Sequence, residues 1–74
     1  MKELYLGLAE IFEIEAEIVT PGLGLESQDH SWDSLAIIST IALVDQKFDI
    51  MLGGQDLANC KTVSDIEALI RAKQ

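Results

Sequence analysis

The chain has 74 residues, of which 49% are hydrophobic, and it carries a formal net charge of −8. This length predicts a single domain over residues 1–74, and the apolar content argues against disorder. The excess of carboxylates excludes nucleic acid as a partner, because phosphate contacts need lysines and arginines. It favours partner proteins with basic patches, although a role in solubility alone would account for the charge equally well.

The sequence also indicates which compartment and which bound groups to expect. The single cysteine, Cys60, forms no internal disulfide, and neither it nor the single histidine, His30, has a metal-ligand spacing. No signal peptide and no run long enough to span a bilayer is present. We therefore expect a cytoplasmic protein with no metal and no membrane insertion, and the charge and size predict a monomer.

A first helix is predicted over residues Lys2–Ile14, because its apolar residues recur at helical spacing. A loop follows, from Glu15 to about Trp32, since Pro21 removes a backbone donor and the nearby glycines permit unusual dihedral angles. So long a loop in so small a domain is typical of a functional segment or of one pinned by its own side chains. Three apolar residues are expected to hold this loop against the core: Ile18, Leu23 and Leu25.

A second helix is predicted to begin at Asp33 or Ser34 and to continue to Phe48. Asp33 suits the N-cap, because its carboxylate can accept hydrogen bonds from backbone N–H groups of the first turn. The apolar residues of this helix cover more than one face. A domain this small cannot surround such a helix, so we expect some of these side chains to be exposed to partners.

The remaining chain predicts two further helices. Residues 49–54 form a connection that ends in two glycines, and residues 55–59 suffice for one or two helical turns. Thr62 and Asp65 then have the spacing of a capping box that opens a final amphipathic helix. Since no segment alternates like a strand, the predicted fold class is all-α: a small bundle of three main helices and one short helix, with a long first loop.

Ser34 is the most informative residue, since it lies where the second helix begins. Free N–H groups and the positive end of the helix dipole favour an anion there, so a phosphate attached to Ser34 would be stabilised. Taken alone, however, a serine at this position is most often a plain helix cap. A nucleophilic serine needs a base and an oxyanion site, and the sequence supplies neither, which disfavours a small hydrolase.

The chain resembles acyl carrier proteins along nearly its whole length. The matching features, in chain order, are the triplet Asp33-Ser34-Leu35, Phe48-Asp49-Ile50 at the end of the second helix, the acidic segment around Asp56, and Thr62-Val63 at the last helix. Asp-Ser-Leu alone is a weak motif. At a helix start in a small acidic chain, with this downstream spacing, it is a strong one.

The resemblance implies that Ser34 is esterified with 4′-phosphopantetheine, delivered from coenzyme A by a phosphopantetheinyl transferase. The thiol of this arm would carry acyl or aminoacyl groups as thioesters, for acyl-loading and acyl-transfer enzymes with basic docking patches. The protein would be a carrier and not an enzyme. Asp33 would help to position Ser34 and would meet the transferase. The residues implied in partner contact are Trp32, Leu35, Ile38, Asp45 and Asp56.

Two features differ from a housekeeping fatty-acid carrier. Many such carriers have acidic residues soon after the triplet, whereas this chain has Ala36 and Ser39 there, and only Asp45 and Asp49 follow. Trp32 before the triplet is similar to more specialised carriers. The resemblance therefore implies a dedicated carrier of a secondary pathway, such as polyketide-like, aminoacyl or cell-surface saccharide modification. It also implies an apolar interior that could shelter a fatty chain.

Other interpretations stay open at individual residues. Trp32 is expected to plug the loop against the core rather than contact a partner, and helical spacing alone would make Leu35 and Ile38 core residues. Cys60 is expected to be a small buried hydrophobe, and His30 an exposed loop residue. For the whole chain, the alternative to a modified carrier is an unmodified carrier-like docking subunit of a larger complex.

Overall fold

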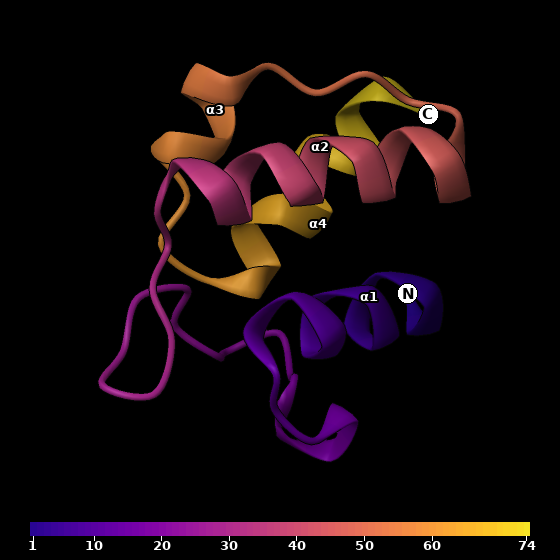
Figure 1. Ribbon diagram of the computed structural model, residues 1–74. Coiled ribbons are helices and arrows are strands. Elements are labelled where there is room, and N and C mark those ends of the chain that lie inside the picture. The colour runs from indigo at the N-terminus through magenta and orange to yellow at the C-terminus, as the bar shows by residue number, and fades with distance from the viewer.

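The computed structural model covers residues 1–74 and contains four α-helices and one 3-10 turn (Figure 1). The elements in chain order are α1 (Lys2–Phe12), η1 (Ala16–Ile18), α2 (Ser34–Phe48), α3 (Gly54–Ala58) and α4 (Val63–Lys73). The prediction of an all-α bundle with three main helices, one short helix and a long first loop is confirmed. No helix combines the length and the apolar composition that a membrane span needs.

α1 ends two residues earlier than the apolar spacing predicts. Glu13 takes a left-handed conformation, with φ of 58°, and its N–H donates to the carbonyl of Glu10 at 3.3 Å. The N–H of Ile14 donates to the carbonyl of Ala9 at 3.0 Å, which satisfies a carbonyl at the helix end. Ile14 therefore belongs to the loop, although its side chain still packs against the core.

α1 and α2 lie side by side and run in opposite directions (Figure 1). Gly7 permits their close approach, because a Cβ atom at this position would overlap a methyl carbon of Leu43. The fully buried side chains of the core come from all four α-helices and from the loop, and they include Leu4, Leu8, Leu25, Val44, Leu57 and Ile66.

Two polar side chains are buried in this core, and each has a partner. The Thr40 hydroxyl donates to the Ala36 carbonyl at 2.8 Å, one turn earlier in α2. The Tyr5 hydroxyl donates to Oε2 of Glu67 at 2.9 Å, which ties α1 to α4. A buried carboxylate without a partner is costly, so this bond accounts for the tolerance of Glu67 inside the bundle.

The long loop closes over the start of α4. The N–H groups of Val63 and Ser64 donate to the carbonyls of Leu23 and Pro21, at 3.0 and 2.8 Å. These are first-turn donors, which have no acceptor inside their own helix. The loop therefore satisfies the N-terminus of α4 and is fixed by it.

The predicted capping box at the start of α4 is confirmed. Thr62 is the N-cap, and Oδ2 of Asp65 accepts from the N–H groups of Lys61 and Thr62 at 2.8 and 3.1 Å. These backbone bonds, that from Lys61 above all, hold the pKa of the Asp65 carboxyl below its usual value.

The apolar side chains that hold the long loop against the core are in part other than those predicted. Leu25 is fully buried and Leu23 is half-buried, as predicted. Ile18 is 51% exposed, so the prediction for this residue is wrong, and Val19 is buried instead. The reason is η1, whose tight turn leaves Ile18 facing solvent before the chain becomes extended at Val19.

Candidate attachment site at the start of α2

The N-terminus of α2 presents Ser34 to solvent. Asp33 is extended, and its Oδ1 accepts a hydrogen bond from the backbone N–H of Ala36 at 3.0 Å. Ser34 is the first residue of the helix, and it is exposed. The predicted cap and the predicted helix start are therefore confirmed, and Ser34 is not itself the cap.

The first N–H groups of α2 are free, whereas those of α4 are not. Neither Ser34 nor Leu35 donates a backbone hydrogen bond within the chain, while the N–H of Ser64 in the first turn of α4 donates to Pro21. The first turn of α2 also contains no acidic residue. Free N–H groups and the positive end of the helix dipole stabilise an anion, so a phosphate ester at Ser34 fits this helix end.

We expect Asp33→Ala to lower the free energy of unfolding by about 1 kcal/mol, because the Ala36 N–H loses its acceptor. Asp33→Asn should retain most of the stability, since its side-chain oxygen can accept the same bond. Urea denaturation followed by circular dichroism measures both variants. Equal stability of Asp33→Ala and the parent would show that this cap contributes nothing to α2.

Two exposed apolar side chains follow Ser34 on α2. Leu35 is 73% exposed and Ile38 is 62% exposed, which confirms that the bundle leaves part of this helix uncovered. α3 lies beside the start of α2 (Figure 1), and its Asp56 is exposed. Asp45 is also exposed, but it lies about 16 Å from Ser34 along the helix axis. The part of α2 that follows Ser34 is therefore mainly apolar, whereas a pocket between α1 and the start of α2 also contains Glu13, Asp29 and Asp33.

Trp32 anchors the chain immediately before the site. Its Nε1–H donates to the carbonyl of Leu57 in α3 at 2.8 Å, and its ring meets Phe12 of α1 edge-on, with centroids 6.1 Å apart. The side chain is half-buried. Trp32 thus plugs the loop against the core, as predicted, and ties the start of α2 to the ends of α1 and α3. Its contact with partners stays a prediction.

His30 supports this arrangement, and its prediction as an exposed loop residue is wrong. Its ring stacks on Phe12 with centroids 4.1 Å apart, and the residue is half-buried. Nε2 lies 3.0 Å from the carbonyl of Gly24, and Nδ1 lies 3.1 Å from the hydroxyl of Ser27. Because a carbonyl only accepts, Nε2 carries the proton. Both ring nitrogens are engaged within the loop, and neither is available as a base for Ser34.

Cys60 lies between α3 and α4 and is buried, as predicted. Its thiol lies 3.4 Å from the carbonyl oxygen of Asp56. Burial raises the pKa of this thiol from 9.0 to about 11, with smaller contributions from the charges of Asp65 and Asp56. No group of three or more histidine, cysteine or carboxylate side chains lies close enough together to hold a metal ion.

We expect Cys60 of the native protein to react with iodoacetamide about 100-fold more slowly than in the unfolded chain at mildly alkaline pH, because only the thiolate attacks. The folded state binds this proton more tightly. The stabilisation from this group is therefore present below pH 9.0 and is lost as the pH rises through about 11. Intact mass recorded over time at several pH values gives the rate. Equal rates in the native and unfolded chains would contradict the buried position.

The fold and the site define a small helical domain that presents one serine at an open helix end. The chain is 34% identical over 74 residues to the meromycolate extension acyl carrier protein of Mycolicibacterium aurum, over 95% of this chain and 75% of that protein. It is 32% identical over 66 residues to an acyl carrier protein of Kocuria rhizophila, over 85% of this chain and 82% of that protein.

A third relative, the acyl carrier protein of Arthrobacter sp. strain FB24, is 28% identical over 99% of this chain and 94% of its own length. No protein-family model matches the sequence. The identities to curated proteins extend over nearly the whole domain. The chain belongs to the acyl carrier protein family.

Proposed function

We propose that Ser34 carries a 4′-phosphopantetheine arm, and that the chain presents acyl or aminoacyl groups, held as thioesters on that arm, to partner enzymes. The observation that carries this proposal is the exposed Ser34 beside two unpaired backbone N–H groups at the start of α2. Membership of the acyl carrier protein family supports the same role. We also place the carrier in the cytoplasm, and we propose a monomer because of its net charge and small size.

The residues of the chain have separate tasks in this proposal. The N–H groups of Ser34 and Leu35 stabilise the negative charge of a phosphodiester, and Asp33 keeps the first helical turn intact. Trp32 fixes the preceding loop, so the serine is presented from a rigid support. When bound, the arm supplies a thiol that holds the cargo as a thioester. The chain provides no base at Ser34, so a separate phosphopantetheinyl transferase must attach the arm from coenzyme A.

We assign the surface around Leu35 and Ile38 to contact with the transferase and with acyl-handling enzymes, together with Asp56 and the exposed part of Trp32. α2 contains only one acidic and one basic residue, Asp45 and Lys47. Binding to this surface therefore depends on apolar burial more than on charge. This balance supports a dedicated carrier of a secondary pathway rather than a housekeeping fatty-acid carrier.

Intact mass before and after incubation with coenzyme A, Mg²⁺ and a broad-specificity phosphopantetheinyl transferase tests the attachment. We expect the parent to gain one phosphopantetheinyl unit, and Ser34→Ala to gain nothing. Ser64→Ala is a matched control, because Ser64 is also an exposed serine in the first turn of a helix, and it should load like the parent. A folded parent that gains no mass with several transferases would overturn the proposal and favour an unmodified docking subunit.

A further inference from the structure

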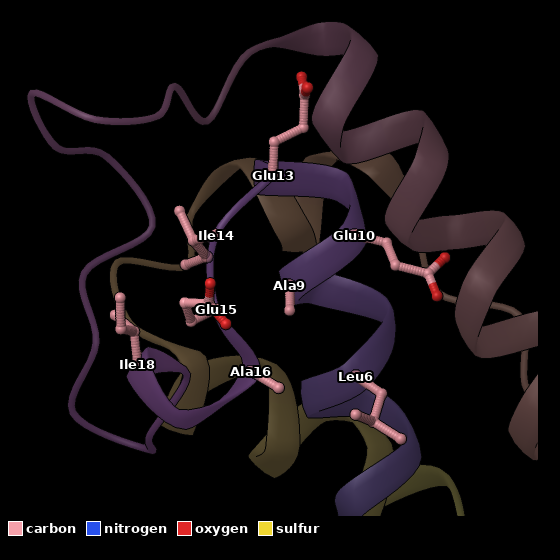
Figure 2. Close-up of a pocket in the computed structure, with 8 residues that line it drawn as sticks. All are labelled: Leu6, Ala9, Glu10, Glu13, Ile14, Glu15, Ala16 and Ile18. Carbon is pink, nitrogen blue, oxygen red and sulfur yellow. The ribbon is translucent and has the colours of Figure 1, made fainter.

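A second apolar surface lies between α1 and η1, on the side of α1 that faces away from α2 (Figures 1 and 2). This α1–η1 groove has a volume of about 680 Å³. Its apolar lining consists of Leu6, Ala9, Ile14, Ala16 and Ile18, and its acidic rim of Glu10, Glu13 and Glu15. Leu6 is 45% exposed and Ile18 is 51% exposed, so two large apolar side chains of the groove face water.

The net charge of the chain is concentrated in the half that contains this groove. Residues 3–46 include nine acidic residues and no lysine or arginine, whereas residues 47–74 include four acidic and four basic residues. Four exposed glutamates cluster at the end of α1 and through η1: Glu10, Glu13, Glu15 and Glu17. No basic residue lines the groove. The groove therefore attracts a basic partner, as do Asp29 and Asp33 at the start of α2.

We propose that the α1–η1 groove is a docking site for a segment of a partner protein that carries one or two aliphatic side chains flanked by lysines or arginines. The aliphatic side chains would cover Leu6 and Ile18. The basic groups would reach the rim, where Figure 2 shows Glu15 among the apolar residues and Glu13 extending outward from the end of α1. Apolar burial provides the affinity, and the charges provide orientation and a higher association rate.

Other occupants are less complementary to the groove. A second copy of the chain, related by a two-fold axis through the groove, would bring two acidic rims together, and like charges across an interface are unfavourable. An anionic membrane surface would be repelled by the same carboxylates. A basic segment with an apolar face matches both the lining and the rim.

A partner bound in the groove would have a different role from an enzyme bound at the surface around Ser34. Because α1 lies between η1 and α2, a partner that covers Leu6 and Ile18 leaves the exposed face of α2 accessible (Figure 1). Glu13, at the end of α1, borders both the groove and the pocket that contains Asp33 and Leu35. One protein could then hold the domain while a second enzyme engages the α2 surface. Such tethering raises the effective concentration of the carrier at the second enzyme without any new contact at Ser34.

The test uses the Ser34→Ala protein, which cannot carry an arm at residue 34. Failure of the peptide to bind would then count against the groove alone, and not against the attachment proposed at Ser34. The probe is a synthetic amphipathic helix of leucine, lysine and alanine, and its control is the matching peptide with glutamate in place of lysine. Heteronuclear NMR reports which amides each peptide perturbs. We expect the lysine peptide to shift the amides of Leu6, Ala16 and Ile18, and the glutamate peptide to shift none.

Variants of the same protein then separate the apolar and charged contributions. Leu6→Gln with Ile18→Gln keeps every charge and should weaken binding roughly tenfold or more. Glu13→Gln with Glu15→Gln should weaken binding and reduce its dependence on salt. Met51→Gln removes an exposed apolar side chain outside the groove and should bind as the parent does.

Three results would overturn the proposal. The first is a set of peptide-induced shifts confined to α2. The second is unchanged affinity when Leu6 and Ile18 are both replaced by glutamine. The third is self-association of the chain, measured by sedimentation equilibrium, that the same double substitution abolishes, because the occupant would then be a second copy.

Discussion

Replacing Ser34 by alanine is expected to abolish all loading of acyl groups onto the chain, while the free energy of unfolding changes by less than about 0.5 kcal/mol. The residue is exposed, and the cap of α2 is Asp33 rather than Ser34. Alanine also has a better helix propensity than serine, so the helix itself does not suffer. The substitution therefore removes the proposed attachment atom and nothing that stabilises the domain.

Two measurements on Ser34→Ala separate function from folding. Incubation with an acyl-coenzyme A, Mg²⁺ and the transferase, followed by intact mass, should show no gain, whereas Ser64→Ala should load fully. Urea denaturation should give the stability of the parent. A mass gain by Ser34→Ala would refute attachment at this residue. A loss of more than about 1 kcal/mol would reveal a structural role that the exposed position of the side chain does not account for.

Trp32→Ala is expected to lower the free energy of unfolding by about 2–4 kcal/mol. The substitution removes the ring that packs edge-on against Phe12, and it leaves the carbonyl of Leu57 without its donor. A domain of this size has a total stability of roughly 4–11 kcal/mol, so the expected loss is a large part of the whole. The start of α2 is released at the same time, so we also expect slower loading of Ser34.

Trp32→Phe is the matched control, because phenylalanine retains an aromatic ring for packing but lacks the N–H donor and is smaller than the indole. Its expected cost is about 1–2 kcal/mol. The chain has a single tryptophan, so circular dichroism rather than fluorescence follows the urea transition. If Trp32→Ala lost less than about 1 kcal/mol, Trp32 would not be the anchor of the loop.

Features that depend on neighbouring residues could be predicted from the sequence. Asp33 caps α2, and Thr62 forms a capping box with Asp65, through contacts within a single helical turn that spacing alone identifies. Partial exposure of α2 could also be predicted, although helical spacing placed Leu35 and Ile38 in the core and only the resemblance to carriers placed these two on the surface, where they lie. A helix with apolar residues on more than one face cannot be covered by so small a domain.

Features that depend on distant contacts could not be predicted. His30 is half-buried because its ring stacks on Phe12, and the residues next to either one in the sequence do not predict this contact. Val19 is buried where Ile18 was predicted to be, because η1 is a short 3-10 turn whose sequence has no apolar period. α1 ends at Phe12 because the next residue, Glu13, takes the left-handed conformation that glycine usually adopts at helix ends.

The candidate site was predicted in part. The sequence locates Ser34 at a helix start, but Ser64 also lies in the first turn of a helix. The resemblance selects Ser34 through the triplet Asp33-Ser34-Leu35, and the fold adds the physical difference: the loop carbonyl of Pro21 accepts the N–H of Ser64, and no carbonyl accepts that of Ser34. The α1–η1 groove likewise depends on the return of η1 toward α1, which composition and spacing do not reveal.

Fragmentation mass spectrometry of the loaded protein tests attachment at Ser34 most directly. We expect the added phosphopantetheinyl group on Ser34 alone, with Ser31, Ser39 and Ser64 unmodified. The group on any of these other serines would contradict the proposed site, as would the absence of any added group while a known carrier in the same reaction is loaded.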